Sequence, residues 1–136
     1  MSSLQQSYIT ALVFIVVFGE LQVNFLDLTV PQYWLPVYDW AVTLEVLEHI
    51  PAEYEQIALD NVARVAGEGI VLSWAIPGQP GFHHINNQPM QHVDEVMAAR
   101  NFQQDPTASK QLREAATFKV FRRNVNVYRR RVIQFQ

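Results

Sequence analysis

The feature that most constrains the fold is a pair of short apolar runs separated by one helix-length segment. Residues 38–44 (YDWAVTL) and 69–75 (GIVLSWA) are the continuous apolar runs expected of strands covered on both faces. The segment between them has Pro51 near its start, which suits a first helical turn, and Gly67 at its end, where a helix can stop. Its apolar side chains recur at helical spacing: Tyr54, Ile57, Ala58, Val62 and Val65.

Alternating strands and helices continue on both sides of this unit. Residues 21–28 alternate and then become apolar, which predicts a strand running into Asp27. Residues 77–89 hold three prolines and two glycines and are expected to form a loop, with helices after it and after Asp105. Residues 124–130 alternate, which predicts a half-exposed strand near a sheet edge. We therefore predict an α/β fold with three layers and a mostly parallel sheet.

The composition suits one soluble globular domain: 136 residues, of which 49% are hydrophobic and 17% are charged. Without cysteine the chain has no disulfide framework and no thiolate metal site, and the redox compartment stays open. Arg64 is the only basic residue before position 100, whereas nine of the ten lie from there onward. A basic end such as residues 129–131 suits a solvated helix and strand better than a nucleic-acid site, so no nucleic acid is expected.

The most apolar segment, residues 9–18 (ITALVFIVVF), precedes Gly19. It is shorter than the roughly 20 residues that a membrane-spanning helix needs, so no span is expected. It resembles the apolar part of a secretory signal with a weak cleavage site, but no Lys or Arg precedes it. A buried strand or helix is the favoured interpretation. The compartment stays open, with the cytoplasm favoured over secretion.

Two carboxylates follow predicted strands, and both are candidates for a ligand site. Asp27 closes the first strand and Glu45 follows the second. In open α/β sheets, ligands bind beyond the carboxyl ends of the strands. A carboxylate there can accept hydrogen bonds from an amine or a ribose hydroxyl, or attract a sulfonium, and it can equally cap a strand end or start a helix.

The stretch Tyr38–Pro51 (YDWAVTLEVLEHIP) resembles the fourth-strand motif of class I S-adenosylmethionine-dependent methyltransferases. That motif has an aromatic-Asp pair, a hydrophobic strand, then Glu, two apolar residues and Glu-His-Ile or Glu-His-Leu. Phe25–Leu28 (FLDL) looks like the end of the family's third strand. The resemblance covers residues 21–131, and within the family the chain is most similar to the metazoan methyltransferase-like proteins. It implies a Rossmann-like methyltransferase sheet.

The resemblance implies a set of cofactor contacts. Asp27 stands where the family's acidic residue hydrogen-bonds the adenine amino group, and the Leu28 backbone would lie beside the ring. The end of the fourth strand touches the methionine part of S-adenosylmethionine in the family, and the residues at that point here are Leu44, Glu45 and Val46. Because Asp27 and residues 45–49 serve one ligand in this picture, we expect them at one end of a shared parallel sheet.

The resemblance also implies residues near the reacting methyl group. His49 is the candidate general base, since its near-neutral titration would suit an acceptor that must lose a proton. A cap or a packing contact is the alternative role for a histidine at a helix start. The loop after the third predicted strand lies on the ligand side and is the candidate for acceptor binding. Its candidate residues are Trp74, His83, His84 and Asn86.

The chain departs from the family in its glycines, which lie at positions 19, 67, 69, 78 and 81. None falls into a GxGxxG motif or a shorter equivalent ahead of Asp27, and only about twenty residues precede the third-strand motif. We therefore expect an N-terminally truncated domain. Residues 1–20 would be an apolar segment, either a replacement strand or a weak signal-like run, and residues 21–136 a partial methyltransferase domain.

Three functions follow as hypotheses. The first is methyl transfer from S-adenosylmethionine to a small molecule or protein in the complete parent, with this chain an incomplete or inactive version. The second is a non-catalytic interaction module derived from the same fold. The third is an unrelated α/β binding domain. In a truncated sheet, residues 21–26 need a new partner, and residues 9–18 are the apolar candidate; otherwise an unprotected edge would favour dimerisation.

Potential metal ligands lie close together in sequence at His83, His84, His92 and Glu95. Their spacing is not the tight, regular spacing of a ligand set, so no metal is expected.

Overall fold

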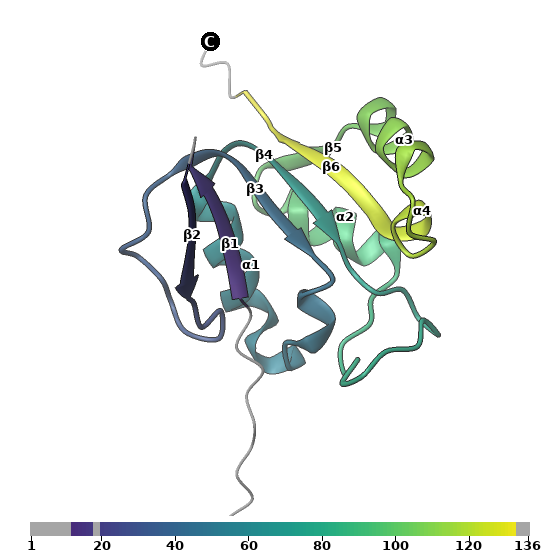
Figure 1. Cartoon of the computed structure of the whole chain (residues 1–136), viewed down its shortest axis with the longest axis horizontal. Helices are drawn as coiled ribbons and strands as arrows, with labels where there is room; N and C mark the ends of the chain where they lie inside the picture. Colours follow the sequence, from purple (N-terminus) through teal and green to yellow (C-terminus); the bar gives the residue numbers. More distant parts are fainter. Residues whose placement is uncertain (1–11, 18–19, 133–136) are drawn as a thin grey trace, which may run out of the picture.

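The computed structural model describes residues 12–17 and 20–132, with side chains from Leu26 onward (Figure 1). The strands are β1 (Leu12–Val17), β2 (Glu20–Phe25), β3 (Tyr38–Leu44), β4 (Ala66–Ser73), β5 (Phe102–Gln104) and β6 (Val125–Arg130). The helices are α1 (Glu55–Val65), α2 (Met90–Ala98), α3 (Pro106–Ala115) and α4 (Phe121–Asn124), with short 3₁₀ turns η1 (Leu47–His49) and η2 (Ala52–Tyr54).

The larger sheet has four strands in the order β3-β4-β6-β5. β3 and β4 are parallel, with Leu44 opposite Ser73 at their carboxyl ends, which confirms the predicted strand–helix–strand unit. β6 is antiparallel to both β4 and β5. Three of these four strands therefore point the same way, and the sheet is mixed because β6 runs against them. This arrangement confirms the predicted α/β, Rossmann-like class.

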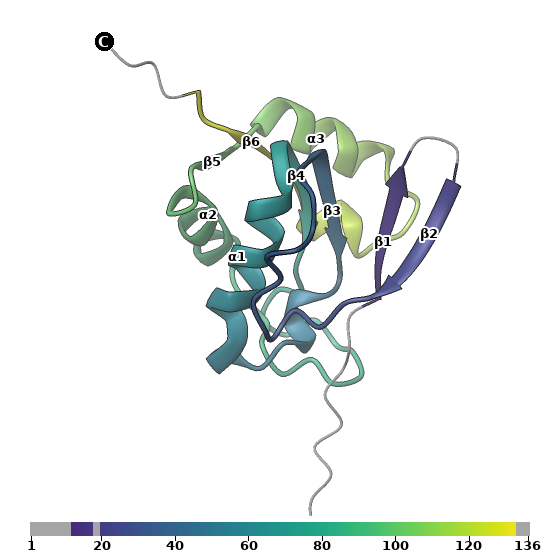
Figure 2. The ribbon, with the colours of Figure 1, turned by 90° about the vertical axis from the view of Figure 1, so that its left-hand side faces the viewer.

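Helices cover the sheet unequally (Figure 2). α1 and α2 lie on one face, and α3 lies on the other face against β6, where the Ser109 hydroxyl accepts a hydrogen bond from the Val127 amide at 2.9 Å. Alternate side chains of β3 remain exposed on the α3 side: Trp40, Val42 and Leu44. The core fills the space between the sheet and α1 and α2, and its largest members are Leu47, Ile50, Leu59, Ile70, Leu72, Trp74, Met97, Phe102 and Tyr128.

The α1–β4 junction differs in detail from the prediction. α1 begins at Glu55, since the residues after Pro51 form the 3₁₀ turn η2, and it ends at Val65. β4 starts at Ala66, three residues earlier than expected, because the ladder with β3 reaches back to the Tyr38–Ala66 pair. Gly69 lies within this ladder, where a Cβ atom would overlap the Trp40 ring, so only glycine lets that ring lie against the strand.

The carboxyl-terminal strand was expected to be half-exposed near a sheet edge, and the expected exposure is wrong. β6 lies between β4 and β5, and Val125–Tyr128 are all buried. The edge beyond it is β5, a three-residue strand that local sequence patterns did not indicate. α2 and α3 are close to their expected ranges, and Asp105 caps α3 by accepting a hydrogen bond from the Ala108 amide at 2.9 Å.

The amino-terminal strands form a separate sheet. β1 and β2 are antiparallel and hydrogen-bond from the Leu12–Phe25 pair to the Val17–Glu20 pair. Residues 12–17 of the apolar run thus supply the partner that β2 needs; the rest of that run lies outside the described residues. The expectation that Asp27 and residues 45–49 end strands of one shared parallel sheet is wrong, because β2 takes its hydrogen bonds from β1.

The end of β2 nevertheless faces the same side of the molecule as the end of β3, as both ribbon views show. Beyond Phe25 the chain leaves the hairpin, and Leu26 and Leu28 insert into the main core. None of the described helices is long and apolar enough to cross a membrane.

Candidate functional site

The Asp27 turn is fixed to α1 by a buried asparagine. Asn61 accepts a hydrogen bond from the Gln32 amide at 2.8 Å and donates to the carbonyls of Leu28 at 3.1 Å and Val30 at 2.8 Å. Within the turn, the Asp27 Oδ1 atom accepts from both the amide and the hydroxyl of Thr29. The carboxylate is half-buried, so it has a fixed direction and remains accessible.

Glu45 occupies the end of β3 and has a φ of 53°, a left-handed conformation that costs energy for any residue other than glycine. Ser73, at the end of β4, holds it there through a reciprocal pair of hydrogen bonds. The Ser73 hydroxyl accepts from the Glu45 amide at 2.8 Å and donates to Glu45 Oε2 at 3.1 Å. The conformation is thus maintained by the neighbouring strand.

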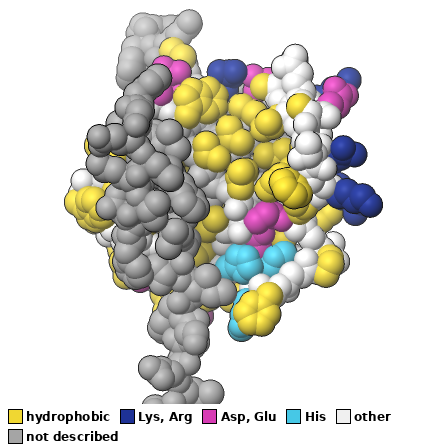
Figure 3. Space-filling model, viewed as in Figure 1, with side chains coloured by type: hydrophobic (Ala, Val, Ile, Leu, Met, Phe, Trp, Pro, Cys, Tyr) yellow, Lys and Arg dark blue, Asp and Glu magenta, His cyan; other side chains and the backbone are white. Residues whose placement is uncertain are grey.

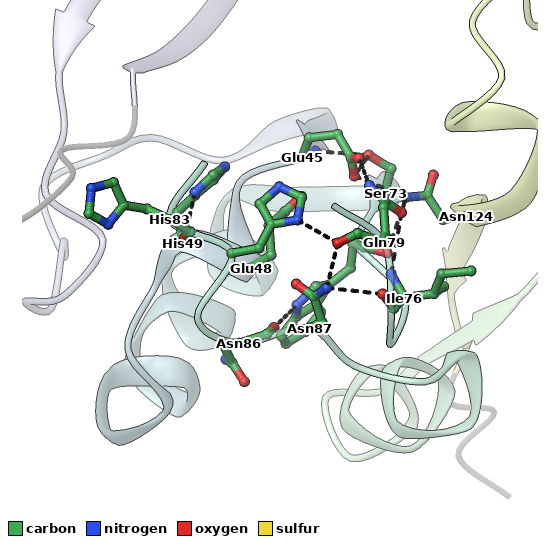
Figure 4. A network of polar contacts seen from close by, with 12 residues as sticks. Glu45, Glu48, His49, Ser73, Ile76, Gln79, His83, Asn86, Asn87 and Asn124 are labelled. Carbon is green, nitrogen blue, oxygen red and sulfur yellow. Dashed lines mark hydrogen bonds and ion pairs between the residues drawn. The ribbon is translucent and has the colours of Figure 1, made fainter. Parts of the chain in front are cut away.

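Two more side chains complete the contacts of the Glu45 carboxylate (Figure 4). Gln79, from the loop after β4, donates to Glu45 Oε1 at 2.6 Å. Asn124, just before β6, donates to Glu45 Oε2 at 3.0 Å and to the Trp74 carbonyl at 3.2 Å. Donors from three separate segments therefore fix this carboxylate at the carboxyl ends of the parallel pair.

Glu48 lies one 3₁₀ turn further on and is fully buried, at 0% exposure. Among the residues that the structure describes, neither of its carboxylate oxygens has a hydrogen-bond partner. Burial, together with the nearby Glu45 carboxylate, raises the pKa of Glu48 from 4.5 to about 8. A buried carboxylate without a partner is rare in folded proteins, because leaving such a group unpaired costs free energy.

His49 is half-buried and contacts the loop that follows β4. Its Nδ1 atom lies 3.0 Å from the carbonyl oxygen of His83, and its ring packs edge-on against His84 at a centroid distance of 5.1 Å. A carbonyl can only accept, so Nδ1 carries the hydrogen and Nε2 is the free basic nitrogen of the neutral ring. The Nε2 atom of His84 lies 4.0 Å from Glu48 Oε1.

Two of the residues predicted to bind the acceptor are structural in this conformation. Trp74 is buried, and its indole N–H donates to the Asn86 carbonyl at 2.7 Å. Asn86 is also buried and donates through Nδ2 to Glu55 at 2.8 Å, and Glu55 pairs with His92 at 2.7 Å. Only His83 of the predicted acceptor set is fully exposed, while His84 is half-buried. A role of these residues in binding stays a prediction.

The predicted cofactor residues are divided between core and surface. Leu28 is buried and its carbonyl is already bonded to Asn61, whereas Leu44 is exposed and Val46 packs partly against the core. Figure 3 shows histidine and acidic side chains gathered directly beside an apolar area. Comparison with Figure 1, drawn from the same side, shows that this area lies over β3, whose Trp40, Val42 and Leu44 side chains are exposed. Polar groups that could position a ligand therefore adjoin an apolar surface.

Sequence reasoning missed four members of this site. Ser73, Gln79 and Asn124 come from segments with no motif, and Asn124 lies 79 positions from Glu45, so no local signal could have identified them. Glu48 lies inside the recognised motif, but an alternation of apolar and acidic residues does not reveal that its carboxylate is buried.

No family model and no curated protein matches the chain. Two solved structures of magnesium protoporphyrin IX methyltransferase from Synechocystis PCC 6803 are similar to it, each with 18% identity over 78% of this chain. The one with bound SAH has a TM-score of 0.55, with 49% of that chain covered. The one with bound SAM has a TM-score of 0.53, with 44% covered. The chain thus has a class I methyltransferase-like fold and spans about half the length of the enzyme it matches.

Proposed function

We propose that this chain forms the part of an S-adenosylmethionine-dependent methyltransferase domain that contacts the adenine and methionine parts of the donor. The observation that carries the proposal is the Glu45 carboxylate, held by three side-chain donors at the carboxyl ends of the parallel strands β3 and β4. Ligands of α/β sheets bind at this position. The similarity to a methyltransferase with bound SAM and SAH supports the same ligand class.

The residues present fit the donor in part. Asp27 offers a fixed, accessible carboxylate for the adenine amino group, on the side of the molecule that the end of β3 also faces. The Leu28 carbonyl already accepts a hydrogen bond from Asn61, so contact of Leu28 with the ring would not use this carbonyl. Leu44 and Val46 flank Glu45 and would contact the methionine part. The sequence has no glycine-rich turn ahead of Asp27 to hold the rest of the donor.

The sulfonium of the donor supplies an already activated methyl group, so the protein's main contribution is alignment of the acceptor. His49 keeps its Nε2 lone pair free because Nδ1–H donates to the His83 carbonyl, and this tautomer suits a general base. The exposed His83 belongs to the loop that would face the acceptor, which we propose to be a small molecule or a protein side chain.

We further propose that the chain alone is an incomplete version of the donor site and binds weakly. The test is a binding titration of the purified chain with S-adenosylhomocysteine in EDTA, for wild type, Asp27→Asn and the control Asp39→Asn. Asp39 is an exposed carboxylate near the opposite end of β3. We expect the wild type to bind more weakly than micromolar. Asp27→Asn should increase the dissociation constant, and Asp39→Asn should leave it unchanged.

Micromolar or tighter binding by the wild type would contradict the proposal that the chain alone is an incomplete donor site. No binding at millimolar ligand, or equal effects of the two substitutions, would contradict the methyltransferase proposal and favour a non-catalytic module.

A further inference from the structure

Three potential metal-ligand atoms converge between η1 and the loop after β4. Glu48, His49 and His84 each contribute one atom, and these atoms all lie within 4.8 Å of one another. The set differs from the histidines that cluster in sequence. His92 is engaged by Glu55 at 2.7 Å, and His83 contributes its carbonyl to His49. The ligand set thus joins two segments 35 residues apart, a proximity that sequence spacing does not reveal.

Both histidines have the tautomer that metal binding requires. His49 Nδ1 lies 3.0 Å from the His83 carbonyl, and His84 Nδ1 lies 3.3 Å from the Gln79 carbonyl. Because each carbonyl accepts, each Nδ1 must carry the hydrogen, and each Nε2 has a free lone pair. Metal-binding histidines typically donate their second N–H to a carbonyl or carboxylate in this way, which fixes the ring orientation.

Glu48 supplies the independent indication that a cation belongs here. Its carboxylate is completely buried, and neither oxygen has a hydrogen-bond partner within the described part of the chain, although the Nε2 atom of His84 is only 4.0 Å away. A carboxylate in this setting is satisfied either by a proton or by a cation. The two imidazoles beside it present lone pairs, not protons, and a bound cation would satisfy all three groups together.

The backbone holds the two segments in register. The amides of Ile85 and Asn86 both donate to the Glu48 carbonyl, at 3.0 and 2.9 Å. Gly81 provides the space for the His84 ring, because a Cβ atom at that position would overlap it. The loop is thus shaped to bring His84 over η1.

We propose that Glu48, His49 and His84 bind a divalent first-row transition-metal ion such as Zn²⁺, and that in the metal-bound chain His49 is a ligand and does not act as the general base. Two imidazoles and one carboxylate suit Zn²⁺ or Fe²⁺, whereas Mg²⁺ and Ca²⁺ prefer sites made of oxygen. Ligand distances near 2.0–2.2 Å require the three atoms to close in by roughly an ångström, which rotation of the half-buried histidines allows. His49 and His84 are both partly exposed, so the ion keeps an open position on the solvent side for water or an acceptor oxygen.

The experiment titrates ZnCl₂ into the metal-free chain by calorimetry and records the visible absorption of the Co²⁺ complex. The matched variants are His84→Asn and His83→Asn, the same substitution at adjacent positions, together with Glu48→Gln. His83 has a φ of 53°, a conformation that asparagine tolerates, so the control is expected to fold.

We expect one ion per chain with a micromolar or lower dissociation constant and the intense visible bands of four- or five-coordinate Co²⁺. His84→Asn and Glu48→Gln should each weaken binding at least tenfold, and His83→Asn should leave it unchanged. Absence of binding to the wild type, or equal weakening by the two histidine variants, would overturn the proposal. Because no S-adenosyl ligand is present, this outcome does not depend on the proposed methyl transfer.

Discussion

Asn61 holds the Asp27 turn against α1 through hydrogen bonds to the backbone of the turn. It is 4% exposed and makes three hydrogen bonds to the backbone of residues 28–32. Asn61→Ala leaves the Gln32 amide and two carbonyls without this partner. At about 1 kcal/mol for each lost bond, less a few tenths for the better helix propensity of alanine, we expect a loss of about 2.5 kcal/mol in the free energy of unfolding.

The assay is urea unfolding followed by circular dichroism, with Gln111→Ala as the control. Gln111 is exposed on α3, and its substitution should change the free energy by no more than about 0.5 kcal/mol. Asn61→Asp is a sharper variant, because it keeps an acceptor for the Gln32 amide but places oxygen against two carbonyls. It should destabilise at least as much as alanine. If Asn61→Ala unfolds within 0.5 kcal/mol of the wild type, the turn is held by other contacts and this reasoning is refuted.

Three further predictions concern the buried carboxyl, the open sheet face and the end of α1. In EDTA, Glu48→Gln should gain stability over the wild type as pH rises, because the unfolded carboxyl loses its proton near pH 4.5 and the folded one near 8. Folding of the wild type therefore takes up a proton in this window, and the advantage of Glu48→Gln in the free energy of unfolding should grow by about 2 to 3 kcal/mol between pH 5.5 and 7.5. If urea unfolding gives the two proteins the same dependence on pH, this prediction is contradicted. Val42 is 55% exposed on the open face of edge strand β3 and should favour self-association. Val42→Lys should therefore shift concentrated samples toward monomer in light scattering, whereas identical masses for the two proteins would argue against this face as a dimer contact. Arg130 donates to the carbonyls of Ala63, Ala66 and Gly67. Arg130→Met should therefore lower the free energy of unfolding by about 1 to 2 kcal/mol, measured by thermal or urea unfolding, whereas Arg131→Met, at an exposed neighbouring position, should change it very little. Equal effects of the two substitutions would refute the capping role.

Local patterns predicted the elements whose signals are local. The apolar runs of β3 and β4 and the Asp105 cap of α3 are each determined by a few neighbouring residues, and all three were found near the expected positions. The parallel pairing followed from the strand–helix–strand order alone, because such a connection almost always gives a parallel pair.

The wrong expectations depend on contacts between distant segments. β6 alternates like an edge strand, yet β5 covers its outer side, and a three-residue strand has too short a pattern to be recognised. β2 was expected to join the main sheet, but β1 lies next to it in sequence and offers a complementary edge. The partners of Glu45 and the burial of Glu48 likewise arise from segments 28 to 79 positions away, so only the fold reveals them.

The central claim is that the turns after β2 and β3 contact one donor molecule. Its most direct test is an NMR titration of the ¹⁵N-labelled chain with S-adenosylhomocysteine, which maps the backbone amides that respond. We expect shifts confined to residues 27–29 and 44–49 that saturate together in one binding curve. Shifts concentrated elsewhere, or separate curves for the two turns, would contradict it.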